Sequence, residues 1–160
     1  MNNASLIKIF KNALPLLACL ATYALAQEPT KNDRFLKAFI QLSSAIGIKK
    51  GLDNDTSCKA KGYKDFSLDE AFNSIPENFF KDDNEKLKMK GDVLPQFNIL
   101  LETKLPDGRP MYQQVYQQTL TAYRQGGIIP NTNDGHCDVM YQAAGNIFQN
   151  AKNNLKLLGK

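Results

Sequence analysis

The sequence predicts an all-α fold, a compact bundle of about five helices with one disulfide bond, after an N-terminal signal peptide. Apolar residues recur every three or four positions along most of the chain, as on one face of a helix. Two cysteines follow an apolar leader, and strand-like alternation is weak throughout. The 160 residues, 42% of them hydrophobic, are typical of one soluble domain. We therefore expect residues 27–160 to form a single helical domain.

Residues 1–26 have the pattern of a bacterial secretory signal peptide. Lys8 and Lys11 precede an apolar run, and Ala-Leu-Ala at 24–26 fits the small-residue cleavage rule. The run of about fourteen residues is shorter than the roughly twenty needed to span a membrane. An alternative is that the Leu-Leu-Ala-Cys ending at Cys19 resembles the lipobox of bacterial lipoproteins. We expect a periplasmic or secreted protein that contacts a membrane only if it is lipidated at Cys19.

Export decides how the cysteines are interpreted. Cleavage removes Cys19 and leaves Cys58 and Cys137, an even number in an oxidising compartment. We expect these two to form a disulfide bond. By the chain-entropy model, closing a loop of 79 residues (137 minus 58) stabilises the fold by about 4–5 kcal/mol. The chain has no C-x-x-C motif and one histidine, so we expect no metal site and no cofactor.

The first helix is expected to begin after Asp33, a good N-cap, and to end near Gly51. Two lysines in its last turn, Lys49 and Lys50, suit the negative end of the helix dipole. Its apolar face consists of Phe35, Leu36, Phe39, Ile40 and Ile46. The polar stretch 51–66 is predicted to be a loop with Cys58 in its middle.

Two helices are predicted in the middle of the chain. Ser67 and Glu70 have the spacing of a capping box and open a short helix that Pro76 ends. A charged stretch at 81–90 is expected to be a solvated short helix or loop. Asp92 then caps a further helix, with Pro95 in its first turn, where a missing N–H costs little. The apolar face of that helix consists of Val93, Leu94, Phe97, Leu100 and Leu101.

Two clear amphipathic helices complete the chain. Pro-Asp-Gly at 106–108 predicts a turn, and Pro110 is suited to start a helix that Gly126 and Gly127 end. Its buried stripe is Met111, Val115, Tyr116, Thr119, Leu120 and Tyr123. After a polar turn at 131–134, a long last helix buries Cys137, Met140, Tyr141, Ala144, Phe148, Ala151, Leu155 and Leu158. The best strand alternative is 97–105, pairing across the Pro-Asp-Gly turn.

Charge and motifs exclude several classes of function. The formal net charge of +4 falls to +2 (18 minus 16) without the leader, which gives no electrostatic reason to expect a nucleic-acid partner. No nucleotide-binding, serine-hydrolase or zinc-protease motif is present. The oxygen-rich stretch 53–57 starts like a calcium loop, but Cys58 replaces its glycine and Lys64 its glutamate. A lysine cluster is explained by helix-end charge and loop solubility: Lys49, Lys50, Lys59, Lys61 and Lys64.

The candidate catalytic group is His136, the single histidine. It stands beside Cys137 and between Asp134 and Asp138, so a secreted hydrolase or effector could use it as a general base with either carboxylate. The alternative is a solvent-facing residue in the first turn of the last helix, with Asp134 as the N-cap. A lone histidine is a weak argument for an enzyme, and we expect no catalytic residue.

The fifth helix carries a polar face almost without charge. Its members are Tyr112, Gln113, Gln114, Gln117, Gln118 and Gln125. Tyrosine is enriched in recognition surfaces, which makes Tyr112, Gln113, Tyr116 and Gln117 the candidate partner-binding residues. We hypothesise a small exported, non-catalytic protein that binds another protein, as inhibitors, immunity proteins and chaperones of the bacterial periplasm do. The alternatives are the hydrolase above and a component of an envelope or secretion assembly.

Overall fold

The computed structural model describes residues 30–129 and 135–159, so the predicted signal peptide, Cys19 and Asp134 lie outside the described residues. The described part is all-helical, as predicted. Its α-helices are α2 (Lys31–Asn54), α3 (Leu68–Phe72), α4 (Asp83–Glu102), α5 (Met111–Gln125) and α6 (His136–Lys156). Short 3-10 turns are η2 (Lys59–Lys61), η3 (Glu77–Phe79) and η4 (Leu157–Gly159). None of these described helices is long and apolar enough to span a membrane.

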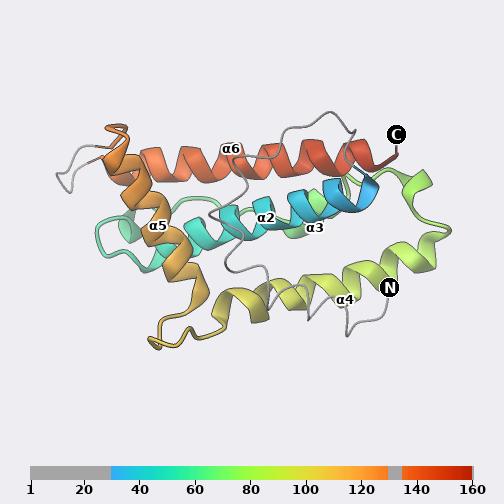
Figure 1. Cartoon of the computed structure of the whole chain (residues 1–160), viewed down its shortest axis with the longest axis horizontal. Coiled ribbons are helices and arrows are strands. Elements are labelled where there is room, and N and C mark those ends of the chain that lie inside the picture. Colours follow the sequence, from blue (N-terminus) through green and yellow to red (C-terminus); the bar gives the residue numbers. More distant parts are fainter. Residues whose placement is uncertain (1–29, 130–134, 160) are drawn as a thin grey trace.

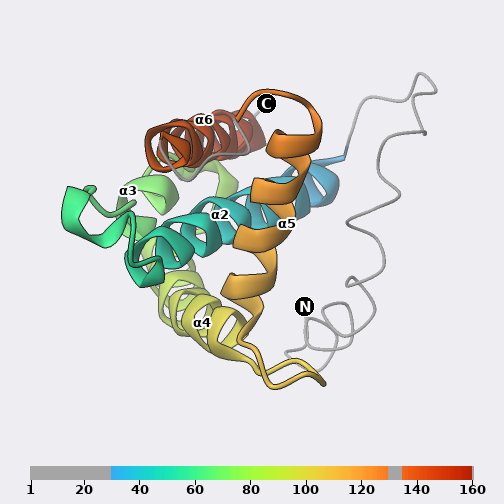
Figure 2. The same cartoon turned by 90° about the vertical axis from the view of Figure 1, so that its left-hand side faces the viewer.

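The two longest helices, α2 and α6, pack side by side and run antiparallel along the centre of the molecule (Figure 1). Helix α5 crosses the end of α2 that leads into residues 55–67, the segment with Cys58 that we call the disulfide loop, and it also touches the start of α6 (Figure 2). Helix α4 runs along the other side of α2, while the short α3 packs against α6. The last turn of α2, the start of α6 and α5 therefore meet at one end of the molecule.

The core has two hydrophobic clusters, both spanned by α2 and α6. The first cluster lies among α2, α3, α4 and the second half of α6: Ala38, Phe39, Leu42, Ala45, Ala71, Phe72, Ile75, Phe97, Phe148, Ala151, Leu155 and Leu158. The second cluster lies among α2, α5 and the first half of α6: Ile48, Leu52, Cys58, Tyr116, Leu120, Ile129, Cys137, Met140 and Ala144. Burial of this much apolar surface is the main stabilising contribution to the fold.

Helix α2 differs from the prediction at both ends. Its N-cap is Thr30, three residues before Asp33, and the two side chains form a reciprocal capping box. It continues through Gly51 to Asn54. The predicted end of the helix was wrong because Gly51 does not terminate α2. It lies where α5 crosses α2. Leu36, expected on the buried face, is 39% exposed.

The crossing of α2 and α5 depends on two glycines of α2. A Cβ at Gly47 would lie 3.3 Å from the Cβ of Val115. A Cβ at Gly51 would lie 2.3 Å from the Cβ of Tyr116, far inside van der Waals contact. A side chain at Gly47 would be crowded, and at Gly51 only hydrogen allows α5 to approach so closely.

Helix α4 is one long helix, where the sequence predicted a charged stretch followed by a separate helix. Asp82, not Asp92, is the N-cap and accepts a hydrogen bond from the backbone N–H of Glu85. Pro95 lies inside the helix instead of in its first turn. The helix persists because Phe97 and Leu101 beyond the proline are buried in the protein.

The remaining elements agree with the sequence. Ser67 accepts a hydrogen bond from the N–H of Glu70 at the start of α3. Helix α5 begins directly after Pro110 and ends at Gly126. Helix α6 has Gly135 at its N-cap, with φ +93°, one residue after the expected Asp134. The predicted strand alternative is reduced to one isolated bridge between Lys104 and Pro110.

Candidate functional site

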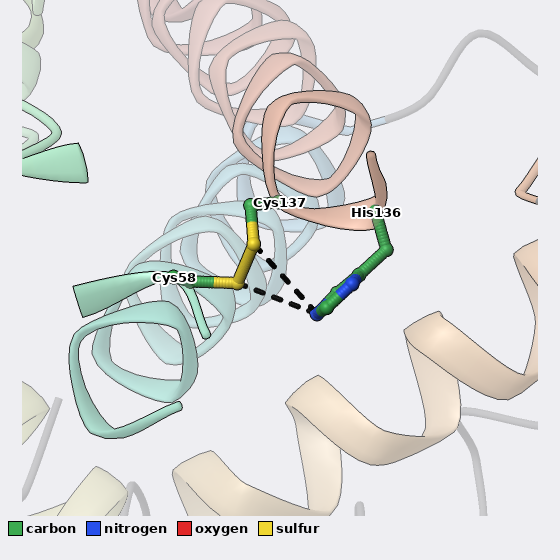
Figure 3. A group of neighbouring side chains, drawn as sticks. All are labelled: Cys58, His136 and Cys137. Carbon is green, nitrogen blue, oxygen red and sulfur yellow. Dashed lines mark hydrogen bonds between the residues drawn. A yellow bond between two sulfur atoms is a disulfide. The ribbon is translucent and has the colours of Figure 1, made fainter. Parts of the chain in front are cut away.

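The candidate site lies at the N-terminus of α6, where Cys137 forms the predicted disulfide bond with Cys58. Cys58 comes from the loop after α2, and its Cα lies 5.4 Å from that of Cys137. Figure 3 shows His136 beside this bond, with its ring directed at both sulfurs. The cysteines are 1% and 3% exposed, so the bond belongs to the second cluster.

His136 is buried, which corrects the expectation that it faces solvent. It is only 3% exposed. Its Nε2 lies 3.3 Å from Sγ of Cys58 and 3.8 Å from Sγ of Cys137. The prediction failed because the first turn of α6 packs against the disulfide loop, and this long-range contact turns the side chain inward. A buried imidazole needs polar neighbours, and among the described residues one of them is a carboxylate.

That carboxylate belongs to Asp55, which lies 81 positions before His136 in the sequence. Oδ2 of Asp55 lies 3.4 Å from Nε2 of His136. The hydroxyl of Tyr116 donates a hydrogen bond of 2.7 Å to the same oxygen. Ser57 donates to Oδ1 through its backbone N–H and its hydroxyl. Asp55 thus joins the disulfide loop to both α5 and α6.

These contacts determine the ionisation of Asp55. Burial alone would raise the pKa of this carboxyl. The hydrogen bonds donated by Ser57 and Tyr116 outweigh burial, and the contact with His136 adds to them, so the pKa falls to about 2. Burial and the neighbouring carboxylate raise the pKa of the Tyr116 hydroxyl. At neutral pH, Asp55 is therefore an anion held by a protonated tyrosine.

Asp138 belongs to a different group of contacts. Its carboxylate accepts hydrogen bonds from Nζ of Lys61 and from the hydroxyl of Tyr63. These two contacts lower the pKa of Asp138. Of the two aspartates proposed to assist His136, Asp138 is thus engaged by the disulfide loop, and Asp134 lies outside the described residues.

The disulfide loop is also held by stacked aromatic rings. Tyr63 stacks on Tyr141 of α6 with ring centroids 4.4 Å apart, and Phe66 lies between Tyr141 and Phe148. The sequence predicted a polar loop with Cys58 in its middle. Tyr63 and Phe66 instead anchor it along α6, and the disulfide acts together with this stack.

The candidate partner-binding residues do not share one surface. Tyr116 is 2% exposed, as the buried stripe predicted, so its assignment to a contact surface was wrong. Tyr112 and Gln113 are half-buried, and Nζ of Lys50 lies 5.8 Å from the centre of the Tyr112 ring. Gln117 is exposed. Of the four, Gln117 is the residue most open to a partner.

Three lysines of the predicted cluster form ion pairs. Lys49 is buried and donates to the carboxylates of Asp53 and Asp65. Burial alone would lower the pKa of Lys49, but its two carboxylate partners outweigh burial and raise it. Lys50 pairs with Glu102, and Lys61 with Asp138. These lysines therefore link elements of the fold.

Three potential metal ligands meet at the site. Sγ of Cys58, Sγ of Cys137 and a ring nitrogen of His136 all lie within 4.8 Å of one another. No sequence motif indicates such a set, because the cysteines are 79 positions apart. While the sulfurs are joined to each other, they offer no thiolate to a metal ion.

Comparisons with protein-family models, with curated proteins and with solved structures find no match to this chain. Function must therefore be inferred from the residues and their contacts. Sequence reasoning did not predict Asp55 as a neighbour of His136, or Ser57 and Tyr116 as the donors to Asp55. The available signal was the dense run of side-chain oxygens at 53–57 next to Cys58, a stretch that resembles the start of a calcium loop.

Proposed function

We propose that the protein is a small exported protein that binds another protein and does not catalyse a reaction. The observation that supports this most is the burial of His136. Its imidazole is 3% exposed and lies between the disulfide and Asp55. A general base must reach a substrate proton directly or through one water. In this arrangement the histidine and Asp55 hold α5, α6 and the disulfide loop together.

Export is supported by the leader and by the disulfide. A buried Cys58–Cys137 bond suits an oxidising compartment, such as the bacterial periplasm or the outside of the cell. The leader offers the cleavage pattern at 24–26. Intact mass of the protein recovered from the periplasm tests this step, since cleavage after residue 26 and lipidation at Cys19 give different masses.

The exposed side of α5 is the proposed contact surface. Between residues 110 and 129, Arg124 is the one charged residue. The exposed positions on this side are Gln117, Gln118, Thr121, Gln125 and, just after the helix, Ile128. Ile128 is 59% exposed. A surface depleted of charge and carrying an exposed aliphatic side chain has the composition of a binding interface.

The experiment is recovery of a partner with the exported full-length protein as bait. A double variant, Gln117→Lys with Thr121→Glu, changes only exposed side chains of α5. The matched control is Gln149→Lys, an exposed glutamine of α6. We expect the wild type and the control to recover the same partner in equal amounts, and the α5 variant to lose it. Equal recovery by all three proteins contradicts the proposed surface.

A hydrolase remains the second candidate because His136 has a carboxylate neighbour. An imidazole 3.4 Å from an ionised Asp55 is the arrangement that orients a histidine base. The two functions are separated by His136→Asn, measured once circular dichroism shows that the helices are intact. If the variant still binds its partner but loses its biological effect, the result favours a hydrolase that uses His136. If the biological effect is unchanged, the result excludes that hydrolase.

A further inference from the structure

We propose that the reduced form of this protein binds a zinc ion between Cys58, His136 and Cys137. The ion would occupy the place of the disulfide and hold the same two segments together. Zinc is a suitable ion because it prefers thiolate and imidazole ligands and accepts four of them in a tetrahedron. The inference does not depend on the proposed partner.

The histidine nitrogen already lies at a suitable distance from both sulfurs for such a site. With Zn–S near 2.3 Å and Zn–N near 2.0–2.1 Å, a sulfur and a nitrogen ligand are about 3.5 Å apart. Nε2 of His136 lies 3.3 Å from one sulfur and 3.8 Å from the other. Figure 3 shows that this nitrogen, and not the rest of the ring, is directed at the sulfurs. Reduction frees the two sulfurs to move to the roughly 3.8 Å expected between thiolates on zinc.

Asp55 is the group placed to complete the site. Its Oδ2 lies 3.4 Å from Nε2 of His136, close to the separation of about 3.3 Å between oxygen and nitrogen ligands of one zinc ion. The carboxylate can occupy the fourth position directly or through a water molecule. Two thiolates and Asp55 would supply negative charge around the cation, and Tyr116 and Ser57 fix the carboxylate.

The exchange between disulfide and metal is balanced. A dithiol reductant gives two electrons and two protons to the Cys58–Cys137 bond, which becomes two thiols, while the reductant becomes a disulfide. Zn²⁺ then displaces the two thiol protons and binds both thiolates. Removal of two electrons by a disulfide oxidant rejoins the sulfurs and releases Zn²⁺. Both cysteines are buried, so a reductant has little access to the closed bond in the folded protein. The reduced state is therefore that of the chain before the disulfide forms.

The zinc site would hold the disulfide loop against α6 when the disulfide is reduced. In the oxidised protein, Cys58 ties this loop to α6 at the point where Asp55 and His136 meet. A zinc ion would join the same residues in a reducing environment, where the disulfide cannot persist. The same fold would thus be held by a metal ion in one compartment and by a covalent bond in the other.

The test uses the full-length chain, reduced with a phosphine, in a Cys19→Ser background that removes the third thiol. The protein is titrated with Co²⁺ and then with Zn²⁺ in competition with a chelating dye. We expect one ion per chain, the visible absorption of tetrahedral cobalt with thiolate ligands, and loss of both after oxidation. Circular dichroism and urea unfolding report whether zinc stabilises the reduced fold.

Variants decide which residues hold the ion. Cys58→Ser with Cys137→Ser should abolish binding, and His136→Asn should weaken it at least about tenfold. Asp55→Asn should weaken it less, and Asp138→Asn, next to a ligand but engaged by Lys61, should bind as the parent does. The proposal is overturned if the reduced parent binds zinc no more tightly than the double cysteine variant. It is also overturned if His136→Asn binds as tightly as the parent, since the two thiols alone would then hold the ion.

Discussion

The side chain of Tyr116 lies directly over Gly51, 65 positions earlier in the chain. A Cβ at Gly51 would be 2.3 Å from both Cβ and Cγ of the tyrosine. The hydroxyl at the other end of the same ring donates to Asp55. One residue of α5 thus contacts α2 through its ring and the disulfide loop through its oxygen.

Gly51→Ala should destabilise the protein strongly, because the added methyl group has no space under Tyr116. Overpacking of a core usually costs about 1–3 kcal/mol, and this contact is with atoms near the backbone that cannot move aside easily. We expect the free energy of unfolding in urea to fall by at least about 2 kcal/mol.

Gly91→Ala is the matched control. Gly91 also lies within a helix, but a Cβ there would meet nothing within 4 Å. The substitution should raise the free energy of unfolding by up to about 1 kcal/mol through helix propensity alone. Equal effects of the two alanines would show that α5 does not press on Gly51.

Removal of the disulfide with Cys58→Ala and Cys137→Ala should lower the free energy of unfolding by about 4–5 kcal/mol. This is the unfolded-state entropy that a link across 79 residues removes. The measurement is urea unfolding of the oxidised protein and the double variant without reductant. A loss below about 1 kcal/mol would mean that the aromatic stack on α6 holds the loop by itself.

Acid stability should depend on Asp55. Its pKa is about 2 in the folded protein, against about 3.9 for an unperturbed aspartate. Because the folded carboxyl has the lower pKa, its contribution is present above pH 4 and is lost as the pH falls towards 2. The difference between the two pKa values corresponds to about 2–3 kcal/mol. Asp55→Asn should remove this part of the pH dependence from urea unfolding between pH 5 and 2.

The control for that measurement is Asp92→Asn, an exposed aspartate of α4. It should follow the acid profile of the wild type. If Asp55→Asn also follows it, the hydrogen bonds from Ser57 and Tyr116 do not stabilise the ionised carboxylate.

Pro95→Ala should stabilise α4. Proline has no N–H to donate to the carbonyl of Gly91, and inside a helix it costs about 3 kcal/mol. Pro95 is exposed, so little packing is lost with its ring. We expect the free energy of unfolding to rise by about 1–3 kcal/mol in urea. A decrease would mean that α4 needs a bend at this point to place Phe97.

Local signals in the sequence predicted much of this fold. The disulfide, the cap of α3, the stripe of α5 and the long α6 follow from residue type and spacing within a few turns of helix. The errors in the predicted helix bounds concern residue types that occur both at helix ends and inside helices. A glycine near lysines resembles a helix end, yet Gly51 is the space beneath Tyr116. A proline after an aspartate resembles a helix start, yet α4 continues because Phe97 is buried.

The site could be predicted only in part. Cys58 and Cys137 were paired by counting, but the neighbour of His136 was sought at adjacent positions in sequence. Asp55 is 81 residues from His136, and their contact requires α2, α5 and α6 to be packed first. Periodicity identifies the face that a residue occupies, but not the partner that tertiary packing brings to it.

Each hydrophobic cluster takes three of its residues from α6, the last long helix that the structure describes. Residues 148, 151 and 155 complete one cluster, and residues 137, 140 and 144 complete the other. During translation neither core can close until α6 has left the ribosome, because its main partner, α2, lies at the opposite end of the sequence. The two halves of the core are therefore expected to form together at the end of synthesis, and not one after the other.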